Sequence, residues 1–166
     1  MIRTISNYEL AEVLEVINEA ARAYMGVIPA DCWHEPYMPR EELLREIEAG
    51  VKFFSYEEDS RLIGVMGRQE LAEVTLIRHA YVRTGAQRRG IGAKLLAHLR
   101  RGVRQPLLVG TWAAAWWAVR FYEKHGFKLV SPDEKDRLLT IYWSIPPRQI
   151  DTSVVLADRK WFESLR

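Results

Sequence analysis

The amino-acid sequence predicts an α/β (α+β) fold in which one mixed sheet carries helices on both of its faces. Two observations lead to this prediction. The first half of the chain holds apolar, β-rich runs joined by a short turn, which is typical of antiparallel hairpins. The second half alternates strand-like runs with helical patterns, which is typical of crossover units that pack helices against a sheet. The predicted order along the chain is β-α-α-β-β-β-α-β-α-β-α-β.

The composition is that of an ordinary globular protein, and 166 residues suit one domain over residues 1–166. The net charge of +2 is too small to indicate a nucleic-acid partner, although eight basic residues fall between Arg78 and Arg104. A solvated helix face explains such a run, and a nucleic-acid surface stays a distant alternative. A single cysteine excludes an internal disulfide, and no long apolar run is present. We therefore expect a cytoplasmic protein without a membrane partner.

The first elements follow from capping and apolar spacing. Residues 1–5 form a short strand candidate, and Ser6 with Glu9 forms a capping box that opens a helix. The apolar stripe of this helix is Leu10, Leu14, Ile17 and Ala21. Residues 29–39 form an aromatic-rich loop before a second helix, which Gly50 ends.

The middle of the chain turns to strands. Apolar runs over 51–56 and 62–69 are joined by a polar turn at 57–60, and a longer strand is expected over 73–82. A glycine-containing loop follows. The next helix has apolar residues at helical spacing, namely Ile91, Leu95, Leu96, Leu99 and Val103.

The last third repeats the alternation of strand and helix. A helix is expected over 113–125, because Gly126 supplies a C-terminal cap. Another helix starts at Ser131, where Pro132 occupies the first helical position. The strands expected here are 106–110, 127–130 and 150–156.

The loop Gln87-Arg88-Arg89-Gly90-Ile91-Gly92 has the features of an anion-binding turn. The nucleotide triphosphatase loop requires Lys and Ser or Thr after its last glycine, and Ile91-Gly92 stands there instead. The dinucleotide fingerprint requires a third glycine at the position of Leu95. What remains is Gln-x-x-Gly-x-Gly between a strand and a helix. Free N–H groups at the helix start and the helix dipole suit a pyrophosphate.

This arrangement resembles the acyl-CoA-dependent N-acetyltransferase superfamily known as GNAT, over roughly residues 2–130. The glycine loop matches the family's Gln/Arg-x-x-Gly-x-Gly/Ala signature, and the strand ending at Arg83 lies where the family has its cofactor-binding strand. Downstream, Ala118 to Phe127 is similar to the family's Ala-x-x-Phe-Tyr-x-x-x-Gly-Phe segment. The resemblance implies a largely antiparallel sheet of about six to seven strands.

The resemblance also implies a reaction: transfer of an acetyl group from acetyl-CoA, as co-substrate, to the amine of a small molecule or peptide by direct attack. Backbone groups near Tyr81 and Val82 would pair with the pantetheine arm and polarise the thioester carbonyl. The loop would hold the pyrophosphate through Gln87, Arg88, Arg89, Gly90, Ile91, Gly92 and Ala93.

Acid and base roles need side chains. Tyr122 matches the family's tyrosine, which would protonate the departing thiolate; free tyrosine and thiol differ by roughly 1.5 pKa units. Alternation along the strand from Glu73 places Glu73 and His79 on one face, so both are candidates for the base. A bulge would shift the later residues, and a water chain is an open alternative.

The acceptor is the least constrained part. The family takes its specificity from the first two helices and their loop, where Trp33 and Tyr37 are candidate substrate contacts in an aromatic-walled pocket for a cationic or apolar amine. No metal motif is present, since no second histidine follows His34 at helical spacing. A homodimer is a further expectation from the fold type.

One departure keeps a second function open. The family often has asparagine where this chain has Ala115, so a side-chain contact in that corner of the site is lost. The alternative is therefore a non-catalytic, regulatory module that binds acyl-CoA.

Overall fold

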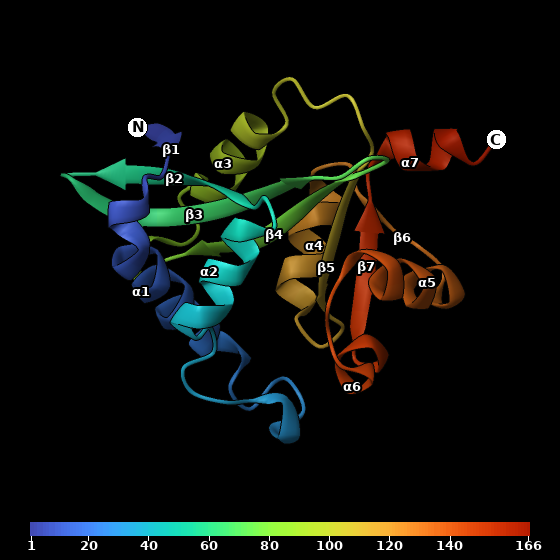
Figure 1. The fold of residues 1–166 in the computed structure, drawn as a ribbon, viewed down its shortest axis with the longest axis horizontal. Helices are drawn as coiled ribbons and strands as arrows, with labels where there is room; N and C mark the ends of the chain where they lie inside the picture. Colours follow the sequence, from blue (N-terminus) through green and yellow to red (C-terminus); the bar gives the residue numbers. More distant parts are fainter.

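The computed structural model describes residues 1–166, and its centre is a seven-stranded sheet of order β1-β2-β3-β4-β5-β7-β6. Only β4 and β5 run parallel; every other pair of neighbours is antiparallel (Figure 1). This mixed, largely antiparallel sheet confirms the predicted fold class. The strands are β1 Ile2–Thr4, β2 Lys52–Glu58, β3 Arg61–Glu70, β4 Thr75–Val82, β5 Leu107–Trp112, β6 Lys128–Leu129 and β7 Ser153–Ala157.

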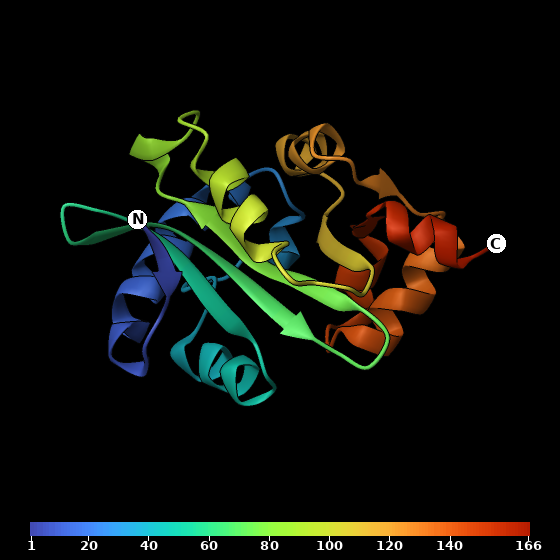
Figure 2. The same ribbon diagram turned by 90° about the horizontal axis from the view of Figure 1, so that it is seen from above.

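Helices cover both faces of the sheet. They are α1 Leu10–Ala21, α2 Arg40–Glu48, α3 Ile91–Leu99, α4 Trp116–Lys124, α5 Pro132–Tyr142, α6 Pro147–Asp151 and α7 Arg159–Ser164. Consecutive strand residues point to opposite faces, so Phe53 packs with α1 and α2 while Phe54 packs with α3. In the same way Leu76 packs with α5 and Ile77 with α3 and α4. Figure 2 shows α1 and α2 on one side of the sheet and α3 and α4 on the other. None of these helices is both long and apolar enough to span a bilayer.

Several element ends differ from the sequence prediction by one to three residues, and two helices, α6 and α7, were not predicted. Strand β4 starts at Thr75 instead of residue 73, because the chain turns at Leu71–Val74, where the N–H of Leu71 donates to the carbonyl of Val74. Strand β7 starts three residues later than predicted, because residues 147–151 form α6. Its first residue is Pro147, which suits the first position of a helix. Helix α7, capped by Asp158, was not predicted.

A bulge interrupts the pairing of β3 with β4. Val65 lies opposite Tyr81 and Gly67 opposite Arg78, so two residues of β4 face one residue of β3. His79 is one of these two and has a φ of 49°. Gly67 makes the bulge feasible, since a Cβ there would lie 2.8 Å from the carbonyl oxygen of Arg78. Bulges bend a strand and re-aim its side chains.

The bulge precedes a gap in the sheet. Strand β4 pairs with β5 only at Thr75, Leu76 and Ile77, which lie opposite residues 107–109. Beyond Ile77 the two strands have no pairing, although β4 continues to Val82 and β5 to Trp112. This leaves the last half of β4 with one hydrogen-bonding edge free, and the functional site is built around that edge.

Candidate functional site

Two cavities meet at the gap between β4 and β5. The glycine-loop cavity, about 810 Å³, lies among the 87–93 loop, α3 and α4. The bulge cavity, about 590 Å³, lies among α2, the β4 bulge, the end of β5 and the segment 143–149. Both volumes are in the range of small-molecule sites. Five residues line both cavities and so form their common wall, namely Tyr24, Ala80, Tyr81, Ala118 and Tyr122.

The glycine loop presents a row of free backbone donors. From Arg88 to Ala93 no backbone N–H has a hydrogen-bond acceptor in the chain, and the ladder of α3 resumes only where Lys94 donates to Gly90. Arg88 and Gly90 are left-handed, with φ of 65° and 75°. Left-handed residues among right-handed ones turn successive N–H groups to one side, which makes an anion-binding concavity. The helix dipole of α3 adds positive potential there.

All but one of the residues predicted to hold the co-substrate line the glycine-loop cavity. They are Tyr81, Val82, Gln87, Arg88, Gly90, Ile91, Gly92 and Ala93. Arg89 does not line it; its guanidinium donates instead to the carboxylate of Glu58 at 2.5 Å. Two consecutive arginines in a tight turn point in different directions, so the loop contributes one full side-chain charge to the cavity through Arg88.

Ion pairs and a hydrogen bond hold this loop against the rest of the fold. The buried guanidinium of Arg83 donates to Glu15 at 2.8 Å and to Glu19 at 2.9 Å, both on α1. Glu19 in turn accepts the backbone N–H of Thr84 at 3.0 Å. The side chain of Gln87 donates to the carbonyl of Val82 at 3.2 Å. The loop is therefore fixed before any ligand binds, which lowers the entropy cost of binding.

Tyr122 stands at the junction of the cavities. The residue is 4% exposed and its ring packs on Phe121 and Phe127, with centroids 5.0 and 5.5 Å away. Burial, with a smaller contribution from Tyr24, raises its pKa above the ordinary value of 10.0. The hydroxyl of Tyr122 has no hydrogen-bond partner in the chain, and its oxygen is not one of the buried polar atoms that lack a partner. The O–H therefore opens onto the cavities with its proton available.

The bulge places His79 in the other cavity, where Glu46 of α2 binds its Nε2. The second carboxylate oxygen of Glu46 accepts from Arg78 at 2.7 Å, and Arg78 also donates to Gln69 at 3.2 Å. Burial raises the pKa of Glu46, but the hydrogen bonds and charges of His79 and Arg78 outweigh it and leave the pKa below its ordinary 4.5. With Nε2 bound to this carboxylate, Nδ1 is the ring nitrogen left to exchange a proton.

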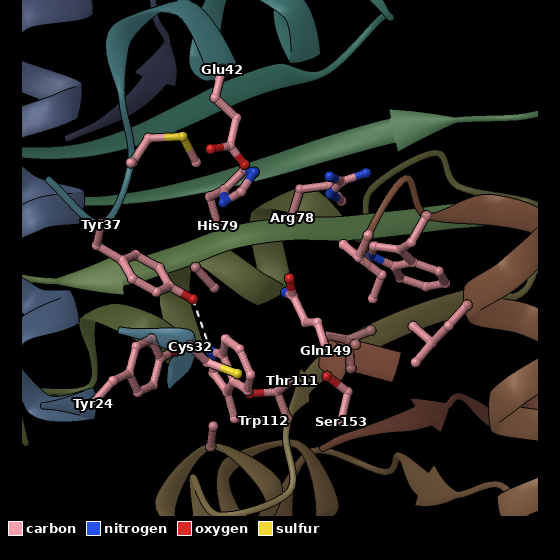
Figure 3. Close-up of a pocket in the computed structure, with 18 of the residues that line it drawn as sticks. Tyr24, Cys32, Tyr37, Glu42, Arg78, His79, Thr111, Trp112, Gln149 and Ser153 are labelled. Carbon is pink, nitrogen blue, oxygen red and sulfur yellow. Dashed lines mark hydrogen bonds between the residues drawn. The ribbon is translucent and has the colours of Figure 1, made fainter. Parts of the chain in front are cut away.

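The other predicted residues fall on either side of the cavity wall. Tyr37 lines the bulge cavity, and its hydroxyl accepts the indole N–H of Trp112 at 2.8 Å (Figure 3). Trp33 lies outside the lining and stacks on Tyr37 with centroids 5.9 Å apart. Glu73 lies outside both cavities in the turn before β4, where it accepts the hydroxyl of Tyr142 at 3.0 Å. The prediction that Glu73 shares a strand face with His79 is wrong, because the strand starts after it.

Several lining residues were missed by sequence reasoning. They are Tyr24, Glu42, Glu46, Arg78 and Gln149, which come from α2, β4 and α6 and from the turn after α1. One signal was present: Glu42 and Glu46 are four residues apart, so they lie on one face of a helix. Nothing in the local sequence indicates that this face looks into a cavity.

The run of basic residues does not form one surface. Arg78, Arg83 and Arg89 each bind carboxylates on different elements, and Arg100 donates to the carbonyl of His125 at 2.7 Å. These contacts assign four of the eight basic residues of the run to internal ion pairs and hydrogen bonds on several sides of the fold.

Residues 11–141 match the family model described as an acetyltransferase (GNAT) domain. The chain belongs to the GNAT family. No curated protein matches it by sequence.

Solved structures agree with this family assignment at the level of the fold. PaiA N-acetyltransferase from Thermoplasma acidophilum, in complex with coenzyme A, has a TM-score of 0.71 at 20% identity, over 95% of this chain and 97% of that one. Ribosomal-protein-S18-alanine N-acetyltransferase from Escherichia coli has a TM-score of 0.68 at 16% identity, over 95% and 92%. N-acetylglutamate synthase from Neisseria gonorrhoeae, solved with coenzyme A and N-acetyl-glutamate, gives 0.65 at 22% identity over 96% of this chain, which spans 35% of that protein.

Proposed function

We propose that this GNAT protein transfers the acetyl group of acetyl-CoA to a primary amine of a small molecule or peptide, by direct attack in a ternary complex. The observation that carries the proposal is the common wall: two cavities of ligand size share Ala80, Tyr81 and Tyr122. Two ligands that enter from opposite sides would meet beside the Tyr122 hydroxyl. A protein that only binds acyl-CoA has no need of the second cavity.

The glycine-loop cavity suits the co-substrate. The free N–H groups from Arg88 to Ala93 would bind the pyrophosphate, and Arg88 would add a charge-assisted contact. The free edge of β4 at Tyr81 and Val82 would pair with the pantetheine arm as an added strand does. A backbone N–H on this edge would stabilise the negative charge that develops on the thioester oxygen. The acetyl group would then lie at the common wall.

The bulge cavity would bind the amine substrate. His79 would accept the proton of the incoming ammonium at Nδ1, since Nε2 is bound to Glu46. The amine nitrogen then forms a bond to the carbonyl carbon, and the bond from that carbon to sulfur breaks. Tyr122 would give its proton to the departing sulfur, and the second proton lost by the amine nitrogen on amide formation would restore the phenol. Burial raises the pKa of Tyr122. The same surroundings would raise the pKa of the CoA thiol, so the pKa values of proton donor and acceptor would stay similar.

The test combines binding with turnover. Calorimetry on the purified protein with CoA measures binding, and thiol release from acetyl-CoA measures turnover across a panel of primary amines, amino acids and an alanyl peptide. We expect CoA to bind and thiol release to depend on one class of amine. Binding of CoA without amine-dependent release over the whole panel would contradict the proposal and favour the regulatory, acyl-CoA-binding module.

A further inference from the structure

We infer that the acceptor is a small aliphatic diamine, whose reacting amine reaches Tyr122 while its second ammonium is bound by Glu42 against the aromatic side of the bulge cavity. This inference rests on the proposed function, because it takes the bulge cavity to be the acceptor site. It is argued from the charges and rings that line that cavity.

One of the carboxylates that line the bulge cavity has no oppositely charged partner. Two arginines and three acids line it, and both arginines are already bound to acids. Arg78 binds Glu46 at 2.7 Å, and Arg148 binds Asp31 through two hydrogen bonds of 2.9 and 3.3 Å. The third acid is Glu42. Its carboxylate has no hydrogen bond and no ion pair anywhere in the chain.

Glu42 faces the cavity from the first turn of α2. It lies one helix turn before Glu46, so the two side chains share a face. Figure 3 shows Glu42 directed into the cavity on the side of His79. The charge of Glu42 acts on the aromatic side of the cavity. The pKa of Tyr37 is raised mainly by burial and next by Tyr24, and the charge of Glu42 adds to this rise.

Aromatic rings complete the cation site. Tyr24 and Tyr37 lie with centroids 5.3 Å apart, and the indole of Trp112 donates to the Tyr37 hydroxyl. All three line the bulge cavity (Figure 3). An ammonium beside such faces is attracted by their electron density, and more strongly where water is excluded. The Glu42 carboxylate and the aromatic rings are therefore both complementary to an ammonium group bound between them.

The same groups disfavour an acidic acceptor. A substrate carboxylate would find no free guanidinium, because Arg78 and Arg148 are paired, and it would be repelled by Glu42. The Asp31–Arg148 pair also joins the turn at Ala30–Cys32 to α6 on the lining of the cavity.

The experiment compares amines that differ only in the second charge. For the protein saturated with acetyl-CoA, we expect 1,4-diaminobutane to have a KM roughly tenfold below that of butylamine, since a partly buried ion pair with cation–π contact is worth about 1.4 kcal/mol. Glu42→Gln should remove most of this preference. Glu41→Gln is the matched control, because Glu41 is the preceding residue of α2, is exposed and lines neither cavity. The preference among diamines of three to five carbons would report the distance between the position of the reacting amine near Tyr122 and the ammonium site at Glu42.

Binding separates this inference from the proposed function. Calorimetric titration of 1,4-diaminobutane into the CoA-saturated protein needs no turnover, and it should lose roughly tenfold in affinity in Glu42→Gln but not in Glu41→Gln. Equal affinity for diamine and butylamine, or an undiminished diamine preference in Glu42→Gln, would overturn the inference even if amines are acetylated. Diamine binding that depends on Glu42 but is not followed by acetylation would support the cation site at Glu42 and would contradict the proposed function.

Discussion

The glycine-loop cavity and the bulge cavity differ in how the chain makes them. The part of the first that presents free N–H groups is consecutive backbone: a strand edge, a turn and the first turn of α3 within residues 81–93. The second is built from side chains of residues 24–46, 77–81, 109–122 and 139–153, which meet only after folding. The polar groups of the first cavity are therefore mainly backbone N–H groups, and apolar side chains of α4 and β3 complete its lining. The second has a particular set of charges and rings.

This difference has a functional meaning. A backbone site requires only glycines and a helix start, so many sequences can bind the same phosphate group. A side-chain site changes whenever one lining residue changes, so it can distinguish one amine from another. Under the proposed function, the common wall at Tyr122 would join a general site to a selective one. Four substitutions test whether the two halves are separable in this way.

The largest effect is expected at the common wall. Tyr122→Phe should lower kcat roughly 10²-fold, because it removes the proposed proton donor, while CoA affinity measured by calorimetry stays near the wild-type value. Tyr142→Phe is the control, since it also loses a phenol hydroxyl but lies outside both cavities. Wild-type turnover in Tyr122→Phe, with chemistry rate-limiting, would remove Tyr122 from the mechanism.

The next effect concerns the bulge. Gly67→Ala should lower the free energy of unfolding by about 1–3 kcal/mol, because the new Cβ meets the Arg78 carbonyl at 2.8 Å and Val51 at 2.9 Å. Urea denaturation measures it. Gly85→Ala is the control, since a Cβ there meets nothing within 4 Å and its φ is not positive. If both variants unfold at the same urea concentration, the bulge is not held by a close approach at Gly67.

A smaller effect separates two neighbouring arginines. Arg88→Ala should raise the Kd for CoA roughly tenfold, because a charge-assisted phosphate contact is worth about 1.5–3 kcal/mol and this one is solvent-exposed. Arg89→Ala should change the Kd much less, since Arg89 binds Glu58 outside the cavity. Equal losses in both variants would mean that long-range charge, and not the geometry of the loop, attracts the anion.

The smallest effect is a pH dependence in the bulge cavity. The pKa of Glu46 is lowered by folding, so its contribution to stability is complete above pH 4.5 and is lost as pH falls further. The midpoint temperature of Glu46→Gln should therefore lie about 2–4 °C below wild type at pH 7, and the gap should close toward pH 3. Glu48→Gln, an exposed acid of the same helix, should show no such closing gap. A gap that widens in acid would contradict the ion-pair account.

The comparison also explains what the sequence could predict. The loop from Gln87 to Gly92 was predictable because its shape depends on local backbone, and the structure confirms that it lies between a strand and a helix. The antiparallel first half was predictable because β2 and β3 are joined by a short polar turn. By contrast, Glu46 and Arg78 are 32 residues apart, and their 2.7 Å contact follows from how α2 packs over β4. Glu73 was misplaced because a turn at Leu71–Val74 shortens the strand by two residues.

The short pairing of β4 with β5 has a mechanical consequence. The backbone pairing between the β1–β4 part of the sheet and the β5–β7 part is limited to three residue pairs and the hydrogen bond from the N–H of Thr75 to the carbonyl of Pro106. The Thr75–Ile77 segment could therefore act as a hinge between the two parts of the sheet. A ligand that contacts both parts, at the unpaired ends of β4 and β5, would hold them at a fixed separation. Occupying one cavity would then set the width of the other, so that the first ligand fixes the shape the second one meets.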